Sequence, residues 1–143
     1  MEFFYEGSVM WSQIDANMHL RHSAYADFAA QARLSILESV GLDGNLFREL
    51  NIGPVLFREE LIYYREIAAN DNVKIKCELT KSRADGSRWS FRHDIFRRDG
   101  IKAATVTVDG AWIDTKKRKL AVLPEVLMEA FKKIPRSLDY IAE

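Results

Sequence analysis

Three polar residues able to carry out acid–base chemistry stand at alternate positions near the start of the sequence: Asp15, Asn17 and His19. A carboxylate can act as a nucleophile or general base, an amide can orient a carbonyl or a water molecule, and an imidazole can transfer protons. Asp and Asn are also frequent in turns and helix caps, which is the alternative interpretation of this segment. The segment is therefore a candidate catalytic loop, and the elements around it decide between these two interpretations.

A long helix is predicted directly after this loop. Apolar residues recur at intervals of three and four along one helical face, and this pattern is carried by Tyr25, Phe28, Ala29, Ala32, Ile36 and Val40. Ser23 is predicted to cap the start of the helix and Gly41 to end it. Free amides at a helix start can stabilise an oxyanion, so the candidate substrate-binding residues here are His22, Ser23, Ala24 and Tyr25.

The remaining elements follow from alternation and turn residues. The sequence predicts a first strand over 3–11, a short helix over 46–50, strands over 55–67, 73–79, 89–95 and 101–113, and a C-terminal helix opened by Pro124. Val126, Leu127 and Phe131 are expected on one face of that last helix. Trp89, Phe91, His93 and Ile95 share a strand face, so His93 is expected to be a hydrogen-bonded core residue.

The order of elements, one strand, a long helix and four sequential antiparallel strands, predicts the α+β class with a single domain over 1–143. One helix covers only part of a five-stranded sheet. The uncovered surface and the edge strands must be covered or paired, which favours a homodimer or a dimer of dimers.

Composition narrows the classes of function. Acidic and basic residues each number 21, so no net basic charge supports a nucleic-acid partner. Cys77 is the only cysteine, which excludes an internal disulfide and disfavours zinc, although His19 and His22 have a short metal-like spacing. The sequence shows neither a signal-peptide pattern nor the roughly 20 apolar residues of a membrane span. We expect a cytoplasmic protein with no membrane partner.

The segment from Trp11 to Tyr25 resembles the catalytic loop of the hotdog-fold thioesterases, in the 4-hydroxybenzoyl-CoA and acyl-acyl-carrier-protein thioesterase superfamily. In that family an Asp-x-Asn-x-His loop precedes a Tyr early in a long helix, and a Glu follows in a Tyr-Arg-Arg-Glu segment. Here Tyr63-Tyr64-Arg65-Glu66 stands at the matching place. The sequence departs from the family where His22 replaces a common Asn and where Gly is missing before Val73.

This resemblance implies a hotdog fold, in which a five-stranded antiparallel sheet wraps a long central helix. It also implies hydrolysis of acyl thioesters by the set Asp15, Asn17, His19 and Glu66. The substrate is then an acyl thioester of coenzyme A, a small molecule, or of acyl carrier protein. No separate cofactor or metal is expected. Without this resemblance, Glu66 beside Arg65 is also consistent with an ordinary surface carboxylate.

Two mechanisms fit these residues. Either Asp15 attacks the thioester carbonyl, or Asp15 or Glu66 activates a water molecule that His19 and Asn17 position; we favour water with Glu66 as base. An enoyl-thioester hydratase of similar fold and a non-catalytic acyl-thioester-binding protein are the alternatives.

Two further sets of residues are candidates for substrate contacts. Arg83 and Arg88 lie in a basic hairpin whose side chains suit the phosphates of coenzyme A, although a charged hairpin is often only a solvated tip. Phe28, Leu34 and Tyr64 are expected to line an acyl pocket.

Overall fold

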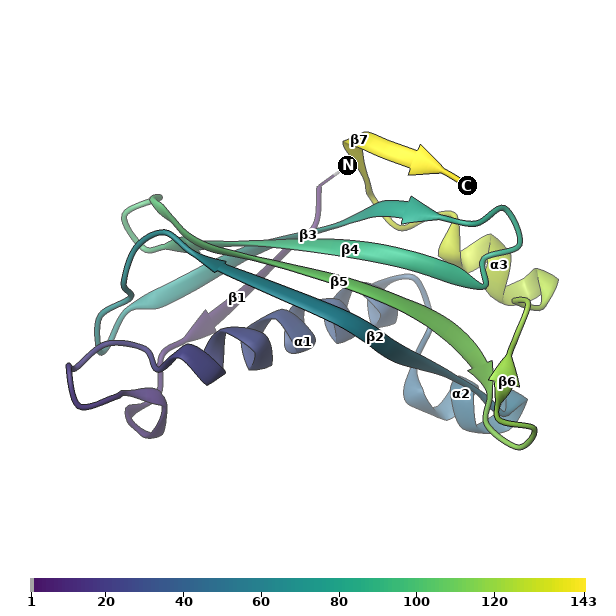
Figure 1. Ribbon diagram of the computed structural model, residues 1–143, viewed down its shortest axis with the longest axis horizontal. Helices are drawn as coiled ribbons and strands as arrows, with labels where there is room; N and C mark the ends of the chain where they lie inside the picture. Colours follow the sequence, from purple (N-terminus) through teal and green to yellow (C-terminus); the bar gives the residue numbers. More distant parts are fainter. Residues whose placement is uncertain (1) are drawn as a thin grey trace.

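A strongly bent antiparallel sheet curves over one long helix in the computed structural model, which describes residues 2–143 (Figure 1). The elements in chain order are β1 (Phe4–Ser8), a short 3-10 turn η1 (Trp11–Gln13), α1 (His22–Ser39), α2 (Gly44–Leu50), β2 (Ile52–Tyr63), β3 (Asn72–Ser82), β4 (Arg88–Arg97), β5 (Lys102–Asp114), β6 (Lys119–Leu120), α3 (Glu125–Phe131) and β7 (Arg136–Ala142). The predicted α+β class and the pairing of a long helix with a sheet are confirmed.

Five strands lie side by side in the order β1-β3-β4-β5-β2, while β6 pairs with β5 and β7 with β3 off this path. We expected the four strands after α1 to pair in sequence, and this was wrong for β2, which pairs with β5 instead of β3. The chain leaves β2 at one edge and crosses the end of the sheet through residues 64–71 before it enters β3. That crossing segment contains Glu66, so the topology itself carries this residue to the end of the sheet beside the start of α1.

The core lies between α1 and the concave face of the sheet. Every second residue of β4 points inward, and the expected set of Trp89, Phe91, His93 and Ile95 is fully or almost fully buried. The Nδ1–H of His93 donates to the carbonyl oxygen of Val106 at 2.8 Å, so its Nε2 accepts from Arg33 of α1 at 3.2 Å. Histidine 93 is the hydrogen-bonded core residue that the pattern predicted.

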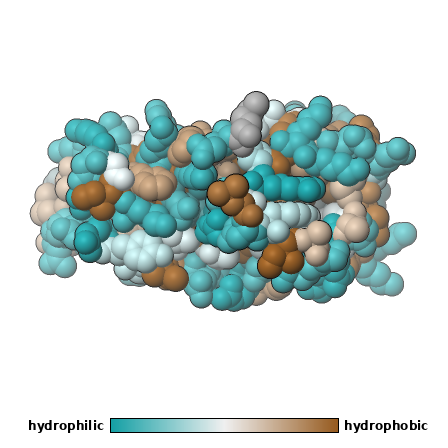
Figure 2. Space-filling model, turned by 90° about the horizontal axis from the view of Figure 1, so that it is seen from above, coloured by the Kyte–Doolittle hydropathy of each residue, from teal (hydrophilic) through white to brown (hydrophobic). Residues whose placement is uncertain are grey.

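The convex face of the sheet carries the alternate, polar residues of the same strands. Arg92 of β4 joins Glu78 of β3 and Asp139 of β7, with N–O distances of 2.9 and 3.0 Å. Seen from above, this face is largely hydrophilic with only separate hydrophobic patches (Figure 2). The face is therefore suited to solvent.

Several predicted boundaries were wrong. The first strand ends at Ser8, and Trp11, expected within it, lies in η1 with 79% of its surface exposed. The strand expected over 55–67 runs from Ile52 to Tyr63, because the chain turns away from the sheet before Glu66. In α3, Leu127 and Phe131 are buried but Val126 is exposed, so these three do not share one face.

Strand β7 was not predicted at all. Its residues carry weak alternation, and β7 pairs in parallel with β3, a contact between segments far apart in the sequence. None of the helices within residues 2–143 is long and apolar enough to cross a membrane.

Candidate functional site

The loop between η1 and α1 is held in shape by Asp15. Its Oδ1 accepts hydrogen bonds from the amides of Asn17 at 2.9 Å and His19 at 3.2 Å. The amide of Asp15 donates to the carbonyl oxygen of His19, and Met18 closes the turn with a positive φ of 63°. A non-glycine residue in this conformation stores strain, a feature that is concentrated at functional sites. Asp15 and Asn17 are exposed, and His19 is half-buried.

The same loop is joined by backbone hydrogen bonds to the segment that follows β2. His19 forms an antiparallel bridge with Ala68, and Leu20 donates to the carbonyl oxygen of Ile67 at 2.7 Å. This pairing brings His19 close to Glu66, and both residues line one open hollow of about 630 Å³. The structure therefore brings together two predicted site residues that lie 47 positions apart in the sequence.

The start of α1 adjoins this loop and has no capping side chain. The helix begins at His22 with Arg21 as the residue before it, so the predicted cap at Ser23 was wrong. The Ser23 hydroxyl instead accepts from Nε of Arg21 at 3.0 Å. The amide of Ala24 donates to the carbonyl oxygen of Arg21 at 3.0 Å, so the amides of His22 and Ser23 are the ones positioned for a ligand, with the positive end of the helix dipole behind them.

Two tyrosines connect the helix start to β2. Tyr25 is buried, and its ring packs edge-on against Tyr63 at 5.0 Å between centroids. The Tyr63 hydroxyl donates to the carbonyl oxygen of His22 at 3.2 Å. Burial raises the pKa of the Tyr25 hydroxyl, and Tyr63 and the negative charges of Glu66 and Asp15 raise it further. The Tyr25 hydroxyl therefore stays protonated, and Ala24 beside it in α1 is fully buried.

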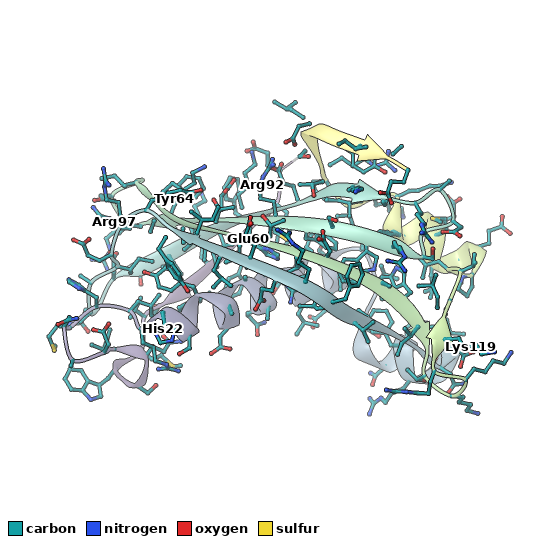
Figure 3. The ribbon with its side chains drawn as sticks, in the orientation of Figure 1. His22, Glu60, Tyr64, Arg92, Arg97 and Lys119 are labelled. Atoms are coloured by element: carbon teal, nitrogen blue, oxygen red, sulfur yellow. The ribbon has the colours of Figure 1, made fainter. Side chains whose placement is uncertain are left out.

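Arg97 also contributes to this site, and the sequence interpretation missed it. Its Nη1 donates to the carbonyl oxygen of Glu66 at 3.1 Å, while its Nε and Nη2 bind the Asp99 carboxylate. Figure 3 shows Arg97, Tyr64 and His22 at one end of the molecule and Lys119 at the other. Arg97 lies at the end of β4, and no local sequence signal connects it to Glu66.

Arg83 and Arg88 lie at the opposite end of the sheet from Asp15. They flank the turn between β3 and β4, next to α3 (Figure 1). Together with Phe57 they line a hollow of about 230 Å³, and the Arg88 guanidinium lies 5.2 Å from the centre of the Phe57 ring. Within one protomer these arginines are therefore not part of the Asp15 site.

The residues expected to line one acyl pocket do not lie together. An apolar hollow of about 270 Å³ opens between α1, α2 and β2, and Leu34, Leu56, Phe91 and Trp112 are among its lining residues. Neither Phe28 nor Tyr64 lines it. Tyr64 instead lies on the convex side, where its hydroxyl donates to Thr105 at 3.3 Å. Of the three residues expected to line an acyl pocket, Leu34 alone lines this hollow.

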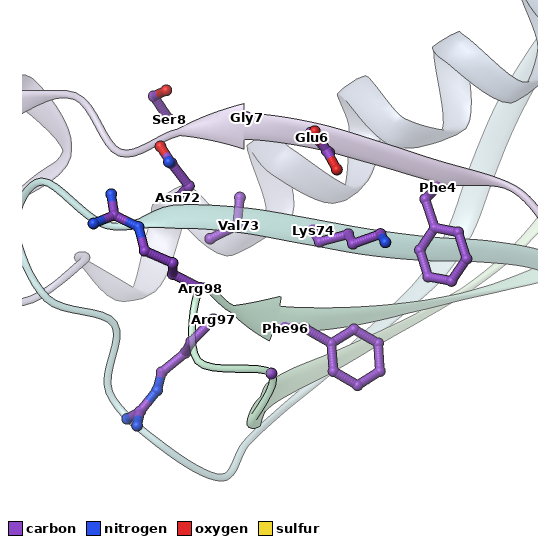
Figure 4. Close-up of a pocket in the computed structure, with 11 residues that line it drawn as sticks. Phe4, Glu6, Gly7, Ser8, Asn72, Val73, Lys74, Phe96, Arg97 and Arg98 are labelled. Atoms are coloured by element: carbon purple, nitrogen blue, oxygen red, sulfur yellow. The ribbon is translucent and has the colours of Figure 1, made fainter.

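A further hollow of about 590 Å³ lies over β1, β3 and the end of β4 (Figure 4). Phe4, Lys74 and Arg98 are among the residues around it, and it contains none of the predicted catalytic residues. Within residues 2–143, no group of three or more His, Cys, Asp or Glu side chains is arranged to hold a metal ion.

Solved structures with the same fold come from several bacteria. A Staphylococcus aureus protein solved in complex with CoA shares 19% identity, with a TM-score of 0.88 over 99% of this chain and 90% of that one. A DHNA-CoA thioesterase from Staphylococcus aureus shares 21% identity, with a TM-score of 0.84 over 92% and 89% of the two chains. A 1,4-dihydroxy-2-naphthoyl-CoA thioesterase from Synechocystis shares 19%, with a TM-score of 0.82 over 99% and 100%.

At these identities the likeness concerns the fold, which is the hotdog arrangement expected from the sequence. No curated protein sequence matches the chain. The model of the thioesterase-like superfamily matches residues 9–131, a stretch that begins before the Asp15 loop and includes α1, the Glu66 segment and the central strands. Since this match spans most of the chain and every residue of the candidate catalytic set, the protein belongs to the thioesterase-like superfamily.

Proposed function

We propose that this protein hydrolyses acyl thioesters of coenzyme A or acyl carrier protein to a free acid and a thiol. The observation that carries the proposal is the backbone pairing of the Asp15 loop with residues 67–69, which sets His19 and Glu66 on one hollow beside the uncapped start of α1. Membership of the thioesterase-like superfamily supports the same class of reaction.

In the favoured mechanism, Glu66 acts as the general base on a water molecule that His19 and Asn17 position and whose second O–H donates to the free Oδ2 of Asp15. The water oxygen attacks the thioester carbonyl carbon while Glu66 takes up its proton. The first amides of α1, those of His22 and Ser23, stabilise the resulting oxyanion. The intermediate then collapses, the C–S bond breaks, and the thiolate leaves and is protonated.

A second route uses Asp15 as the nucleophile. Its Oδ1 is engaged by two amides, whereas Oδ2 accepts no hydrogen bond from the rest of residues 2–143. Oδ2 can therefore attack the carbonyl carbon, expel the thiolate and form an anhydride that water opens. A single turnover in water labelled at its oxygen, followed by mass spectrometry of the protein, distinguishes the two routes. We expect an unlabelled protein, and label in Asp15 would overturn the direct water route.

The main test is the substitution Asp15→Asn. The amide keeps an oxygen for the two loop amides but can neither attack a carbonyl nor accept a proton. We expect turnover to fall at least about a hundredfold, a typical loss for one acid–base group. Thiol release from acyl-CoA measures the effect, and Asp27→Asn, which changes an exposed carboxylate of α1, is the matched control. Near-wild-type hydrolysis by Asp15→Asn would contradict the assignment.

Two other functions remain as alternatives. A hydratase would add water to crotonyl-CoA without releasing a thiol, so both reactions should be followed with that substrate. A binding protein would hold acyl-CoA tightly without turnover, although the presence of both Asp15 and Glu66 argues against it. A thiol-release screen with short, medium, long and aromatic acyl groups would then define the substrate.

We also propose that two copies associate through β2. Within residues 2–143 this edge strand pairs with β5 alone, and its exposed side chains include Val55, Leu56 and Phe57, the last with 58% of its surface exposed. The apolar hollow and Leu34 of α1 adjoin the same edge. A two-fold axis through such an edge makes the two β2 strands antiparallel.

This association explains how distant residues serve one site. Antiparallel β2 strands place the Asp15 end of one protomer next to the opposite end of its partner. That opposite end has the apolar hollow, which suits an acyl group, and the arginines Arg83 and Arg88, which suit phosphates. Neither arginine forms an ion pair within residues 2–143, and Nε of Arg88 is buried without a hydrogen-bond partner.

A further inference from the structure

The apolar hollow between α1, α2 and β2 contains a single charged group. Of the residues that line its space of about 270 Å³ within residues 2–143, Arg33 alone carries a charge. The others are apolar, aromatic or glycine, and they include Leu37, Phe91 and Trp112. Pockets for small molecules have this composition, an apolar wall with a few placed polar groups. One cation in such a wall favours a ligand with negative charge at that point.

The hydrogen-bond partner of Arg33 is neutral. Its Nη1 donates to Nε2 of His93 at 3.2 Å, because Nδ1–H of the same ring donates to the carbonyl oxygen of Val106. Burial lowers the pKa of His93 to about 3, so the imidazole carries no charge at neutral pH. Within residues 2–143 Arg33 forms no other hydrogen bond and no ion pair. The histidine therefore orients the guanidinium without neutralising its charge.

Two groups of the chain lie near enough to act on the charge of Arg33, namely Cys77 and Glu59. Burial raises the pKa of Cys77 to about 12, so its thiol stays uncharged. Glu59 stands opposite buried Val108 in the β2–β5 register and shares its concave side of the sheet. Its side chain is exposed and forms no ion pair with Arg33 within residues 2–143. The described chain thus supplies no paired counter-ion for Arg33.

The position of Arg33 is costly without an anion. Burial lowers the pKa of Arg33, since surroundings of low polarity penalise an unpaired charge, but a guanidinium keeps its proton in proteins. The N–H groups that His93 leaves free are not enclosed by protein atoms, so a ligand in the hollow can reach them. Two parallel N–H groups of a guanidinium match the two oxygens of a carboxylate. A carboxylate in the hollow would therefore offset this cost.

We propose that Arg33 selects acyl groups that end in a carboxylate, which makes the preferred substrate a monothioester of a dicarboxylic acid. The inference rests on the proposed function and names its substrate class. The methylene groups of the acyl chain contact the apolar wall, and the terminal carboxylate accepts hydrogen bonds from Arg33. An alkyl group of the same length fills the hollow but leaves Arg33 without a counter-ion.

Binding of thioethers tests this assignment without catalysis. A carboxyalkyl thioether of pantetheine has no thioester carbonyl to hydrolyse, and it carries the arm that coenzyme A and acyl carrier protein share. It is titrated calorimetrically beside the carboxamide of equal chain length. We expect the carboxylate to bind on the order of tenfold more tightly, the effect of one charge-assisted hydrogen bond, and the difference to shrink as salt rises. Equal affinities, or no binding of either compound, would overturn the proposal.

Variants assign the preference to Arg33. Arg33→Gln keeps a donor for His93 but has no charge, so it should bind the two thioethers equally, whereas Arg33→Lys should keep part of the preference. Glu59→Gln is the matched control, because Glu59 acts on the charge of Arg33 but does not line the hollow. This control should keep the full preference. The same loss in Glu59→Gln as in Arg33→Gln would assign Arg33 to Glu59 and overturn the proposal.

Hydrolysis gives a second readout. With acyl-CoA pairs of increasing and equal chain length, the wild-type protein should have a kcat/KM on the order of tenfold higher for the dicarboxylic monothioester than for the alkyl thioester. Arg33→Gln should lose this difference and still hydrolyse the alkyl thioester. Equal kcat/KM values at every length would overturn the assignment. Absence of all hydrolysis by the wild-type protein would instead contradict the proposed function, and the thioether titration would still decide the role of Arg33.

Discussion

At the scale of single residues, the candidate site depends on side chains that hold the backbone as much as on those that react. Asp15 fixes its own loop through two amides, and Arg97 holds the carbonyl oxygen of Glu66 from the end of β4. These contacts hold the backbone of the Asp15 loop and of Glu66, which lines one hollow with His19, before any substrate binds. Catalytic groups held in advance lose less free energy to reorganisation in the transition state.

Arg97 gives the residue-scale prediction. Arg97→Gln removes its charge and its hold on Glu66, so we expect kcat to fall on the order of tenfold with little change in KM, as for a lost positioning contact. Arg97→Lys should restore part of the loss. Arg98→Gln, which changes the more exposed neighbour, is the control in the same thiol-release assay. Equal effects of the Arg97 and Arg98 substitutions would argue against a positioning role.

At the scale of elements, α1 and β2 define the site and its boundaries. Helix α1 presents an uncapped start to the loop, and β2 forms an exposed edge that must be covered to avoid uncontrolled strand pairing. The crossing segment after β2 connects these two features, because it carries Glu66 from the edge strand to the helix start.

The edge strand gives the element-scale prediction. Leu56→Glu places a charge on the exposed edge of β2, where a partner copy would bury it. We expect the proposed dimer to dissociate at least about a hundredfold more readily, which corresponds to roughly 3 kcal/mol. Analytical ultracentrifugation measures the change. Leu138→Glu, at a fully exposed leucine of β7, is the control, and an unchanged association of Leu56→Glu would exclude this interface.

At the scale of the whole molecule, the packing of α1 on the sheet buries a titratable group. His93 lies between Arg33 of α1 and Val106 of β5, and Cys77 is opposite it on β3. Burial, assisted by the Arg33 charge, lowers the pKa of His93 to about 3. Burial also raises the pKa of Cys77 to about 12, so Cys77 does not titrate in acid.

This burial predicts a loss of stability in mild acid. Between pH 6.5 and pH 3 the unfolded chain binds a proton at His93 that the folded chain does not, so stability falls as pH decreases through this range. We expect the His93 contribution to the free energy of unfolding to fall by about 2 kcal/mol between pH 7 and pH 5. Urea unfolding at both pH values measures it. His93→Gln, though less stable at pH 7, should lose this share of the pH dependence, whereas exposed His22→Gln should keep it.

The sequence by itself determined the features that repeat locally. The three- and four-residue spacing of α1, the alternation of β3 and β4, and the inward position of His93 were all predicted, because side-chain periodicity reflects which face is buried. The order of Asp15, Asn17, His19 and Glu66 also indicated the superfamily.

Only the tertiary structure decided which distant segments meet. The pairing of β2 with β5, the parallel addition of β7 to β3, and the contact of Arg97 with Glu66 join residues that no local pattern connects. Local propensities are similar for many strand orders, and the choice among them depends on the free energy of burying the whole sheet against α1. For the same reason, the sequence named Arg83 and Arg88, but only the fold showed that they lie at the far end of the protomer from Asp15.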